Sequence, residues 1–365
     1  MKSVETSSLK QGMVVAENVY SKNGQLIVSS NSCLTRQMIS HLVYYKIESI
    51  KIIDVEQIPE ETKESINKKS EIERTHMVRL LSSREFEIFQ KQYIENVAVL
   101  EDNFNDIILK NIPIDEPKLI TDTVELFEQN STTYSLFGML HSMKQIDDST
   151  YAHCINVSII SRLIGTWVNM SKEDLDTLTL AGLLHDIGKC QIPKDILLKP
   201  GKLTAQEYEF IKKHPEFGYG IVQNQDIDDR IKKAVLLHHE RYDGTGYPYG
   251  YSGEQLDDFE SIVCIADVYD AMTSARCYRG ALCPFDVIAN FEQEGLGKYH
   301  PKFIYLFLEK IATSYLNSDI LLSNGQVGRI IYINNQLTRP IVQLKDNNSF
   351  LNLEEHPDIY VEAII

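Results

Sequence analysis

The spacing of apolar residues predicts a mainly helical protein with a small strand-containing unit at each end. Between residues 71 and 316, apolar positions recur at the interval expected for the buried face of a helix. Two long amphipathic helices are expected over 71–109 and 116–143, and a series of shorter helices follows from residue 150 onward. The middle of the chain is therefore expected to be all-helical.

The first part of the chain has the turn residues and short apolar runs of a small α+β unit. Asn23-Gly24 is a strong hairpin signal between two such runs. The expected elements are, in order, a β-rich run from Gly12, a strand at 26–28, a helix over 35–45 and a strand over 47–53. Residues 55–75 are rich in charged and polar residues, which indicates a linker or a solvated helix start.

Four segments follow from these patterns. They are a small α+β unit over 1–54, a linker with long helices over 55–147, an all-helical segment over 148–316 and a β-rich unit over 317–365. The last unit contains strand-like runs at 327–333 and 341–344. The long helices either cover the all-helical segment or form a contact between two copies of the chain.

The all-helical segment is expected to contain several short helices with recognisable ends. Ser171-x-x-Asp174 resembles a capping box, and it opens a helix that runs into His185-Asp186. Pro215 restarts the chain after a helix that ends near His214. The expected helices of this segment cover about 150–168, from Ser171 into 185–186, from Thr204 to near 214, 231–239, 262–274, 285–294 and 302–315.

Composition narrows the class of protein without changing this architecture. The 365 residues allow two or three domains, and the apolar and charged fractions of 43% and 24% are those of an ordinary soluble protein. A net charge of -16 argues against binding a nucleic acid polymer, though not against a small anionic ligand. We find no apolar run of membrane-spanning length and no secretion signal, so we expect a cytoplasmic protein without a membrane partner.

The cysteines point to neither a zinc ribbon nor a disulfide framework. The six of them are scattered and none has a Cys-x-x-Cys spacing. We interpret them as buried free thiols.

Histidine and aspartate residues are concentrated in the all-helical segment. Five of the ten histidines fall between residues 153 and 239. Each one alone is more often a core or surface residue than a ligand, and a lone aspartate is more often a cap or a buried hydrogen-bonded group. Together they form a set of seven candidate metal ligands: His153, His185, Asp186, His214, His238, His239 and Asp267.

A mixture of imidazole and carboxylate suits iron, manganese, zinc or nickel. Seven ligands exceed the need of one ion, and Asp186 is suited to bridge two. Two ions that share a bridge can lower the pKa of a bridging water and stabilise an in-line phosphoryl displacement. Because neighbouring helical positions point about 100° apart, we expect the helix before His238-His239 to end there.

Three cations and one loop complete the candidate site. The cations are Lys189, Arg276 and Arg279. Each one alone is interpreted as a surface residue, but beside a metal cluster the three are suited to hold phosphate. Gly246-Tyr247-Pro248 reads as a tight turn or, directly after the two histidines, as a ligand-binding loop. Asp270 shares a helix face with Asp267, so it either orients a histidine ligand or makes a structural hydrogen bond.

The combination of motifs resembles the HD-GYP family, a branch of the HD-type metal phosphohydrolases. The resemblance covers about 148–316 and rests on these motifs: His153-x-x-x-Val157, Leu184-His185-Asp186-Ile187-Gly188-Lys189, Ile192-Pro193, His214-Pro215-x-x-Gly218, His238-His239-Glu240-Arg241-Tyr242-Asp243-Gly244, Gly246-Tyr247-Pro248, Ala266-Asp267-Val268-Tyr269-Asp270-Ala271 and Arg276-x-Tyr278-Arg279.

The resemblance implies an all-helical phosphodiesterase that hydrolyses cyclic di-GMP to linear pGpG and often to GMP, with iron or manganese as its metals. The seven candidate ligands would then hold the ions, and Asp186 and Lys189 would be catalytic. Substrate would be held by Lys189, Gly246, Tyr247, Pro248, Arg276 and Arg279.

Three positions depart from the family pattern. Members with a third metal have a glutamate four residues before the first histidine, where this chain has Ser149, so we expect two metals. Cys277 replaces a proline in the arginine motif, and His300 replaces an aspartate in Tyr299-His300-Pro301.

We therefore expect a two-metal cyclic di-GMP phosphodiesterase in which a metal-bridging hydroxide attacks phosphorus. Two alternatives remain open. One is a hydrolase of another cyclic dinucleotide, such as cyclic GMP-AMP, or of a different phosphate ester. The other is a binding or scaffold protein that keeps the fold without turnover.

Overall fold

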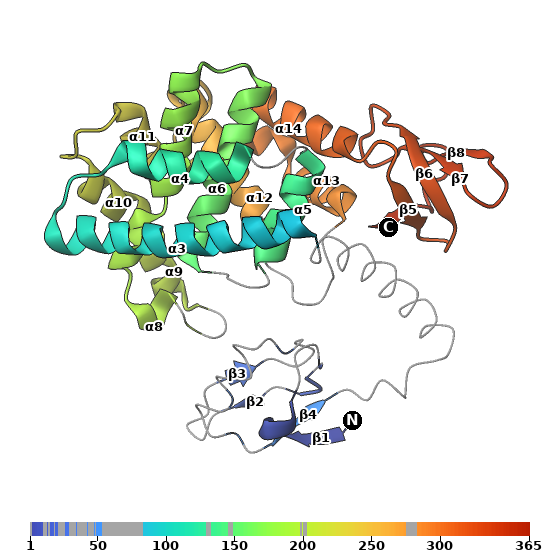
Figure 1. Cartoon of the computed structure of the whole chain (residues 1–365), viewed down its shortest axis with the longest axis horizontal. Helices are drawn as coiled ribbons and strands as arrows, with labels where there is room; N and C mark the ends of the chain where they lie inside the picture. Colours follow the sequence, from blue (N-terminus) through green and yellow to red (C-terminus); the bar gives the residue numbers. More distant parts are fainter. Residues whose placement is uncertain are drawn as a thin grey trace. The chain divides into compact units, whose positions relative to one another are not determined.

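The computed structural model describes residues 83–128, 133–144, 149–197, 199, 203–274 and 283–365, together with scattered positions between 2 and 52. These residues belong to two compact units (Figure 1). The first unit comprises residues of Met1–Ser70 and Pro193–Ile211, and the second comprises those of Glu71–Ile192, Lys212–Ser274 and Ala281–Ile365.

The first unit contains two antiparallel strand pairs around a small apolar cluster. Strand β1 (Lys2–Glu5) pairs with β4 (Ser49–Ile52), and β2 (Val19–Tyr20) pairs with β3 (Leu26–Val28). Val15 and Leu42 are fully buried in its core. Two short helices, α8 (Lys194–Leu197) and α9 (Ala205–Ile211), belong to the same unit. The turn expected at Asn23-Gly24 and, apart from Leu42, the helix expected over 35–45 lie outside the described residues.

The second unit is a helical bundle with a sheet at its C-terminal end (Figure 1). Its α-helices are α3 (Arg84–Lys110), α4 (Glu116–Glu128), α5 (Thr133–Lys144), α6 (Thr150–Trp167), α7 (Lys172–Leu184), α10 (His214–Val222), α11 (Asp229–Leu237), α12 (Asp258–Ser274), α13 (Pro284–Glu294) and α14 (Pro301–Ser314). The helices expected from residue 150 onward are present within a few residues of their predicted ends.

In this unit, the predicted helices differ from the structure at three places. The helix expected from residue 71 begins at Arg84, because Ser83 is extended and caps α3. Helix α10 was not predicted.

The third difference concerns the prediction of a single helix over 116–143. The structure has two helices there, because α4 ends at Glu128 and α5 begins at Thr133. The sequence between the two helices, Gln129-Asn130-Ser131-Thr132, lies outside the described residues and contains Asn, Ser and Thr, which favour helix ends and turns over helix interiors.

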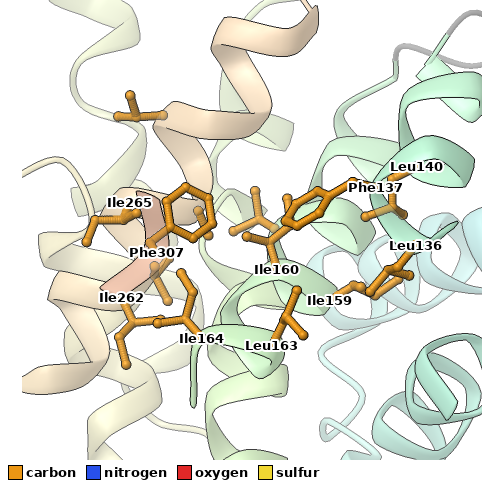
Figure 2. Packing of buried hydrophobic residues seen from close by; sticks show 14 of the residues in the cluster. Leu136, Phe137, Leu140, Ile159, Ile160, Leu163, Ile164, Ile262, Ile265 and Phe307 are labelled. Atoms are coloured by element: carbon orange, nitrogen blue, oxygen red, sulfur yellow. The ribbon is translucent and has the colours of Figure 1, made fainter. Parts of the chain in front are cut away.

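Helix α6 forms the centre of the bundle. Every residue from Cys154 to Gly165 is buried, so α6 is enclosed on all sides rather than exposed along one face. Figure 2 shows Ile160 and Ile164 of this helix among side chains from α5, α12 and α14. Gly182 of α7 lies so close that an added Cβ would be 2.6 Å from the Cα of Ser158. This close approach brings the ends of α6 and α7 together.

The C-terminal sheet has five antiparallel strands in the order β8-β7-β6-β5-β9. They are β5 (Asp319–Leu322), β6 (Val327–Tyr332), β7 (Ile341–Leu344), β8 (Phe350–Asn352) and β9 (Val361–Ile364). Buried residues of the sheet, such as Ile320 and Val342, belong to the same hydrophobic core as the helices. The expected fold class is therefore confirmed: mainly helical, with a small N-terminal unit and a C-terminal β-rich region.

No helix among the described residues is both long enough and apolar enough to cross a bilayer.

Candidate metal centre

The candidate ligands come from helices that converge at one end of α6 and α7. His153 lies in the first turn of α6, and His185-Asp186 follows directly after the last residue of α7. His214 is the first residue of α10. His238-His239 follows α11, which ends at Leu237 as the paired histidines required. Asp267 lies in α12.

Asp186 stands between two groups of histidines. Its Oδ2 is 3.4 Å from the Nε2 atoms of both His153 and His185, and its Oδ1 is 3.2 Å from His214 Nε2 and 3.8 Å from His238 Nε2. The ligand atoms of each group lie within 4.8 Å of one another. Since one carboxylate faces both groups through different oxygens, the arrangement has the form of a bridged pair of cation sites.

Asp267 and His239 close the same cluster. Asp267 Oδ1 is 3.1 Å from His153 Nε2, and its Oδ2 is 3.5 Å from His239 Nδ1. His239 also has its ring centroid 4.2 Å from that of His238. The structure thus brings all seven residues that were predicted from the sequence into one cluster.

Hydrogen bonds outside the cluster orient the histidine rings. His185 Nδ1 is 2.7 Å from the carbonyl of Gly182, and His238 Nδ1 is 3.0 Å from the carbonyl of Val235. A carbonyl only accepts, so both Nδ1 atoms carry the proton and both Nε2 atoms present a lone pair to the cluster. This is the usual arrangement of a metal-binding histidine.

The donor set fits a cation better than it fits a hydrogen-bonded core. Nε2 atoms lie 3.3 Å apart in the pair His153–His185 and 3.2 Å apart in the pair His214–His238. The Oδ1 atom of Asp186 is buried and accepts no hydrogen bond from the described residues. Lone pairs that face one another away from water are unfavourable unless a cation lies between them.

Electrostatics differ among the ligands: Asp186, His238 and His239 are held in the deprotonated form that coordinates a cation, whereas Asp267 and Asp270 favour the protonated form of His153. Burial opposes the charge of Asp186, yet Lys189 holds the pKa of this carboxyl well below its usual range. Burial lowers the pKa of His239 to about 3, and burial together with its histidine neighbours holds the pKa of His238 well below the ordinary value. Burial also lowers the pKa of His153, but hydrogen bonds to Asp267 and Asp270 prevail and raise it to about 9.

Lys189 lies against this cluster in a short 3-10 helix, η3 (Ile187–Gln191). Its Nζ donates to Asp186 Oδ2, and its side chain is 22% exposed, so it faces both the cluster and solvent. Gly188 permits the close approach of this segment to α10, since an added Cβ would lie 1.9 Å from the carbonyl oxygen of His214.

The Gly246-Tyr247-Pro248 loop packs directly on the cluster. The Tyr247 ring lies 4.7 Å from that of His239, and an added Cβ on Gly246 would lie 2.4 Å from the Cα of Glu240. The Tyr247–Pro248 peptide bond is cis. The structure therefore brings the predicted loop residues to the edge of the candidate centre.

Sequence reasoning assigned no role to Glu240 or Lys212. Glu240 is buried, and its carboxylate accepts backbone N–H bonds from Tyr249, Gly250 and Tyr251 at 2.7–3.1 Å. Lys212 Nζ lies 5.3 Å from the centroid of the Tyr247 ring. A role for Glu240 could have been inferred from the sequence, because this acidic residue directly precedes a glycine-rich loop. Nothing in the sequence distinguished Lys212 from other lysines.

The remaining predicted positions have different outcomes. Arg276, Cys277 and Arg279 lie outside the described residues. Ser149 caps α6, with its Oγ accepting from Ala152 N–H at 3.2 Å. His300 stands at the N-cap of α14 without a capping hydrogen bond, and its ring packs on Tyr242 and Phe303.

Comparison with known proteins places this cluster in a family. A profile of the HD domain family matches residues 117–302, just over half of the chain. The fold is similar to that of Bd1817, an HD-GYP-type protein of Bdellovibrio bacteriovorus, with a TM-score of 0.50 and 16% identity over 84% of this chain and 98% of that one.

Three curated relatives share the helical region. The chain is 38% identical over 169 residues to the cyclic di-GMP phosphodiesterase response regulator RpfG of Xanthomonas campestris, covering 46% of this chain and 44% of the relative. It is 32% identical over 190 residues to the cyclic di-GMP phosphodiesterase PA4108 of Pseudomonas aeruginosa, covering 52% and 46%. It is 30% identical over 176 residues to the 3'3'-cGAMP-specific phosphodiesterase 2 of Vibrio cholerae, covering 48% and 34%.

The chain spans less than half the length of each of these relatives. The matched segment nevertheless contains all seven residues of the cluster. The chain belongs to the HD domain family, in its HD-GYP branch.

Proposed function

We propose that this protein is a metal-dependent phosphodiesterase that hydrolyses cyclic di-GMP to pGpG and then to GMP. The observation that supports this most strongly is the position of Asp186, which faces two groups of inward-pointing histidine nitrogens through its two oxygens. A cluster of this form suits two adjacent divalent cations, and two-cation sites are typical of phosphoryl hydrolysis.

Iron or manganese fits the ligand set, which contains nitrogen and oxygen donors and no thiolate. One ion would be held by Asp186, His214, His238 and His239, and the other by Asp186, His153, His185 and Asp267. When bound, the ions supply Lewis acidity and lower the pKa of a coordinated water.

The protein's own residues hold and orient the substrate. Lys189 lies beside Asp186 and faces solvent, so its ammonium is placed to neutralise a non-bridging phosphate oxygen. Tyr247 lies over His239 and offers a ring face to a purine at the edge of the cluster. Arg276 and Arg279 are assigned to the phosphates from the sequence motif alone.

The choice of cyclic di-GMP over other cyclic dinucleotides rests on the relatives. RpfG and PA4108 are named for cyclic di-GMP, while a Vibrio cholerae relative of similar identity is specific for 3'3'-cGAMP. A cyclic GMP-AMP hydrolase is therefore the second candidate. A binding module without turnover is less well supported, because such a module has no need for all seven ligands.

A product assay tests the proposal. The protein, purified anaerobically and loaded with Fe(II) or Mn(II), is offered cyclic di-GMP and 3'3'-cGAMP in separate reactions, and the products are identified by mass. Faster cleavage of cyclic di-GMP to pGpG is expected. Preference for 3'3'-cGAMP would support the second candidate, and binding without cleavage by fully metallated protein would support the third.

A further inference from the structure

A buried lysine from outside the ligand helices lies behind His153. Lys144 is the last residue of α5, and its side chain is 9% exposed. Its Nζ is 2.5 Å from Asp270 Oδ1, and it donates to the backbone oxygen of Asp270 and to Thr273 Oγ1, both at 2.6 Å. Nζ thus makes two hydrogen bonds and one ion pair, which together hold Lys144 in one orientation.

Asp270 connects Lys144 to the metal-ligand cluster through His153. While Oδ1 faces Lys144, Oδ2 lies 2.7 Å from His153 Nδ1. The opposite ring nitrogen of His153, Nε2, faces Asp267 at 3.1 Å and Asp186 at 3.4 Å. The order of contacts is therefore Lys144, Asp270, His153 and then the candidate metal centre.

The carboxylate of Asp270 needs a fixed orientation to do this. Its side chain is 2% exposed, so no solvent holds it in place. A carboxylate hydrogen-bonded to the outer nitrogen of a histidine sets both the tautomer and the ring angle of that ligand. Lys144 supplies the second anchor that prevents Asp270 from turning away.

We propose that Lys144 is a positioning residue: it fixes Asp270 so that His153 presents Nε2 to the metal. This inference rests on the metal-dependent function proposed above. It extends the functional unit to α5, which precedes the first ligand helix and which carries no candidate ligand among its described side chains. Lys144 itself contacts neither metal nor substrate.

Binding of Mn(II) to the metal-free protein tests the proposal without using activity. Calorimetric titration is performed on the full chain and on Lys144→Met, Lys144→Arg and Arg162→Met. Arg162 is the matched control: its side chain is 7% exposed, close to the 9% of Lys144, and it pairs with the more exposed Asp176 at 2.8 Å, on the same helix as His153, without touching a ligand. Replacing a residue that hydrogen-bonds to a metal ligand typically lowers metal affinity by 10–100-fold.

We expect Lys144→Met to weaken Mn(II) binding about 10-fold or more, Lys144→Arg to recover part of it, and Arg162→Met to lower thermal stability with unchanged Mn(II) affinity. Equal Mn(II) affinity in Lys144→Met and the unmodified protein overturns the proposal, as does an equal loss of affinity in Arg162→Met.

If Lys144→Met does not fold, Thr273→Val replaces it, because this variant removes one hydrogen-bond acceptor of Lys144 Nζ. An unchanged Mn(II) affinity in Thr273→Val also overturns the proposal. Failure of the unmodified protein to bind Mn(II) would instead overturn the proposed function along with this inference.

Discussion

Lys189 and Asp186 form an ion pair at the candidate centre but differ in burial. Asp186 is fully buried and faces both groups of histidines, whereas Lys189 remains partly exposed while donating to it. A buried carboxylate without compensation is costly, so the lysine stabilises the charge of Asp186 while its exposed part faces solvent. The two residues should therefore respond differently to substitution.

Lys189→Met should retain two metals and lose about 100-fold in kcat, because the cations replace the lysine as partners of Asp186 but not as a partner of the phosphate. Metal content by mass spectrometry and steady-state kinetics are measured together. Lys172→Met, at an exposed position in the first turn of α7, is the matched control. Normal turnover in Lys189→Met would remove this residue from the substrate site.

Glu260 gives the stability of the protein a predicted dependence on pH. Burial, with a contribution from the charge of Asp257, raises the pKa of Glu260 from 4.5 to about 7. The folded state thus binds a proton more tightly than the unfolded chain, so the stability from this group is present at low pH and is lost as the pH rises toward 7.

The free energy of unfolding of Glu260→Gln, relative to that of the unmodified protein, should accordingly rise by about 3 kcal/mol from pH 5 to pH 8. Urea unfolding at both pH values measures the difference, and the exposed Glu254→Gln serves as control. A difference between the two proteins that does not change with pH would show that Glu260 ionises normally.

Among the structural elements, the loop after α11 depends on one carboxylate. Glu240 accepts three consecutive backbone N–H groups, from Tyr249 to Tyr251, and so shapes the loop that carries Tyr247. Charge-assisted hydrogen bonds of this kind are stronger than neutral ones. The loop is thereby held next to the cluster although it has little regular structure.

Glu240→Gln should raise KM about 10-fold with unchanged metal content, since the amide accepts fewer and weaker bonds and the loop loses its fixed position. Glu254→Gln, at the far end of the same loop, should leave KM unchanged. A loss of metal in Glu240→Gln would place this residue in the support of the ligands instead.

The approach of η3 to α10 requires glycine at position 188. An added Cβ would lie 1.9 Å from His214 O and 2.4 Å from Gly218 N, and both atoms belong to the backbone. Gly188→Ala should therefore destabilise the protein by about 3 kcal/mol or more. Gly220→Ala is the matched control, because nothing lies within 4 Å of its added Cβ and alanine favours the helix. Thermal unfolding of both variants distinguishes a local clash from a general intolerance of alanine.

At the scale of the whole molecule, the sequence predicted best the parts that depend on local patterns. The helices from residue 150 onward have caps and periodic apolar positions, and the seven ligands are spaced across them in a recognisable order. Strands β5, β8 and β9 were not predicted, because their burial depends on a sheet whose pairing is not local. Lys144 and Lys212 were missed for the same reason, since their roles depend on residues far away in the chain.

The central claim is that His185 and Asp186 belong to a two-metal site that hydrolyses a cyclic dinucleotide. The most direct measurement is the metal stoichiometry of anaerobically purified protein, paired with turnover of cyclic di-GMP, for the unmodified chain and for His185→Ala with Asp186→Ala. The structure predicts about two metals per chain with turnover in the first, and loss of both metal and turnover in the second. Unchanged metal content in the double variant would contradict this account.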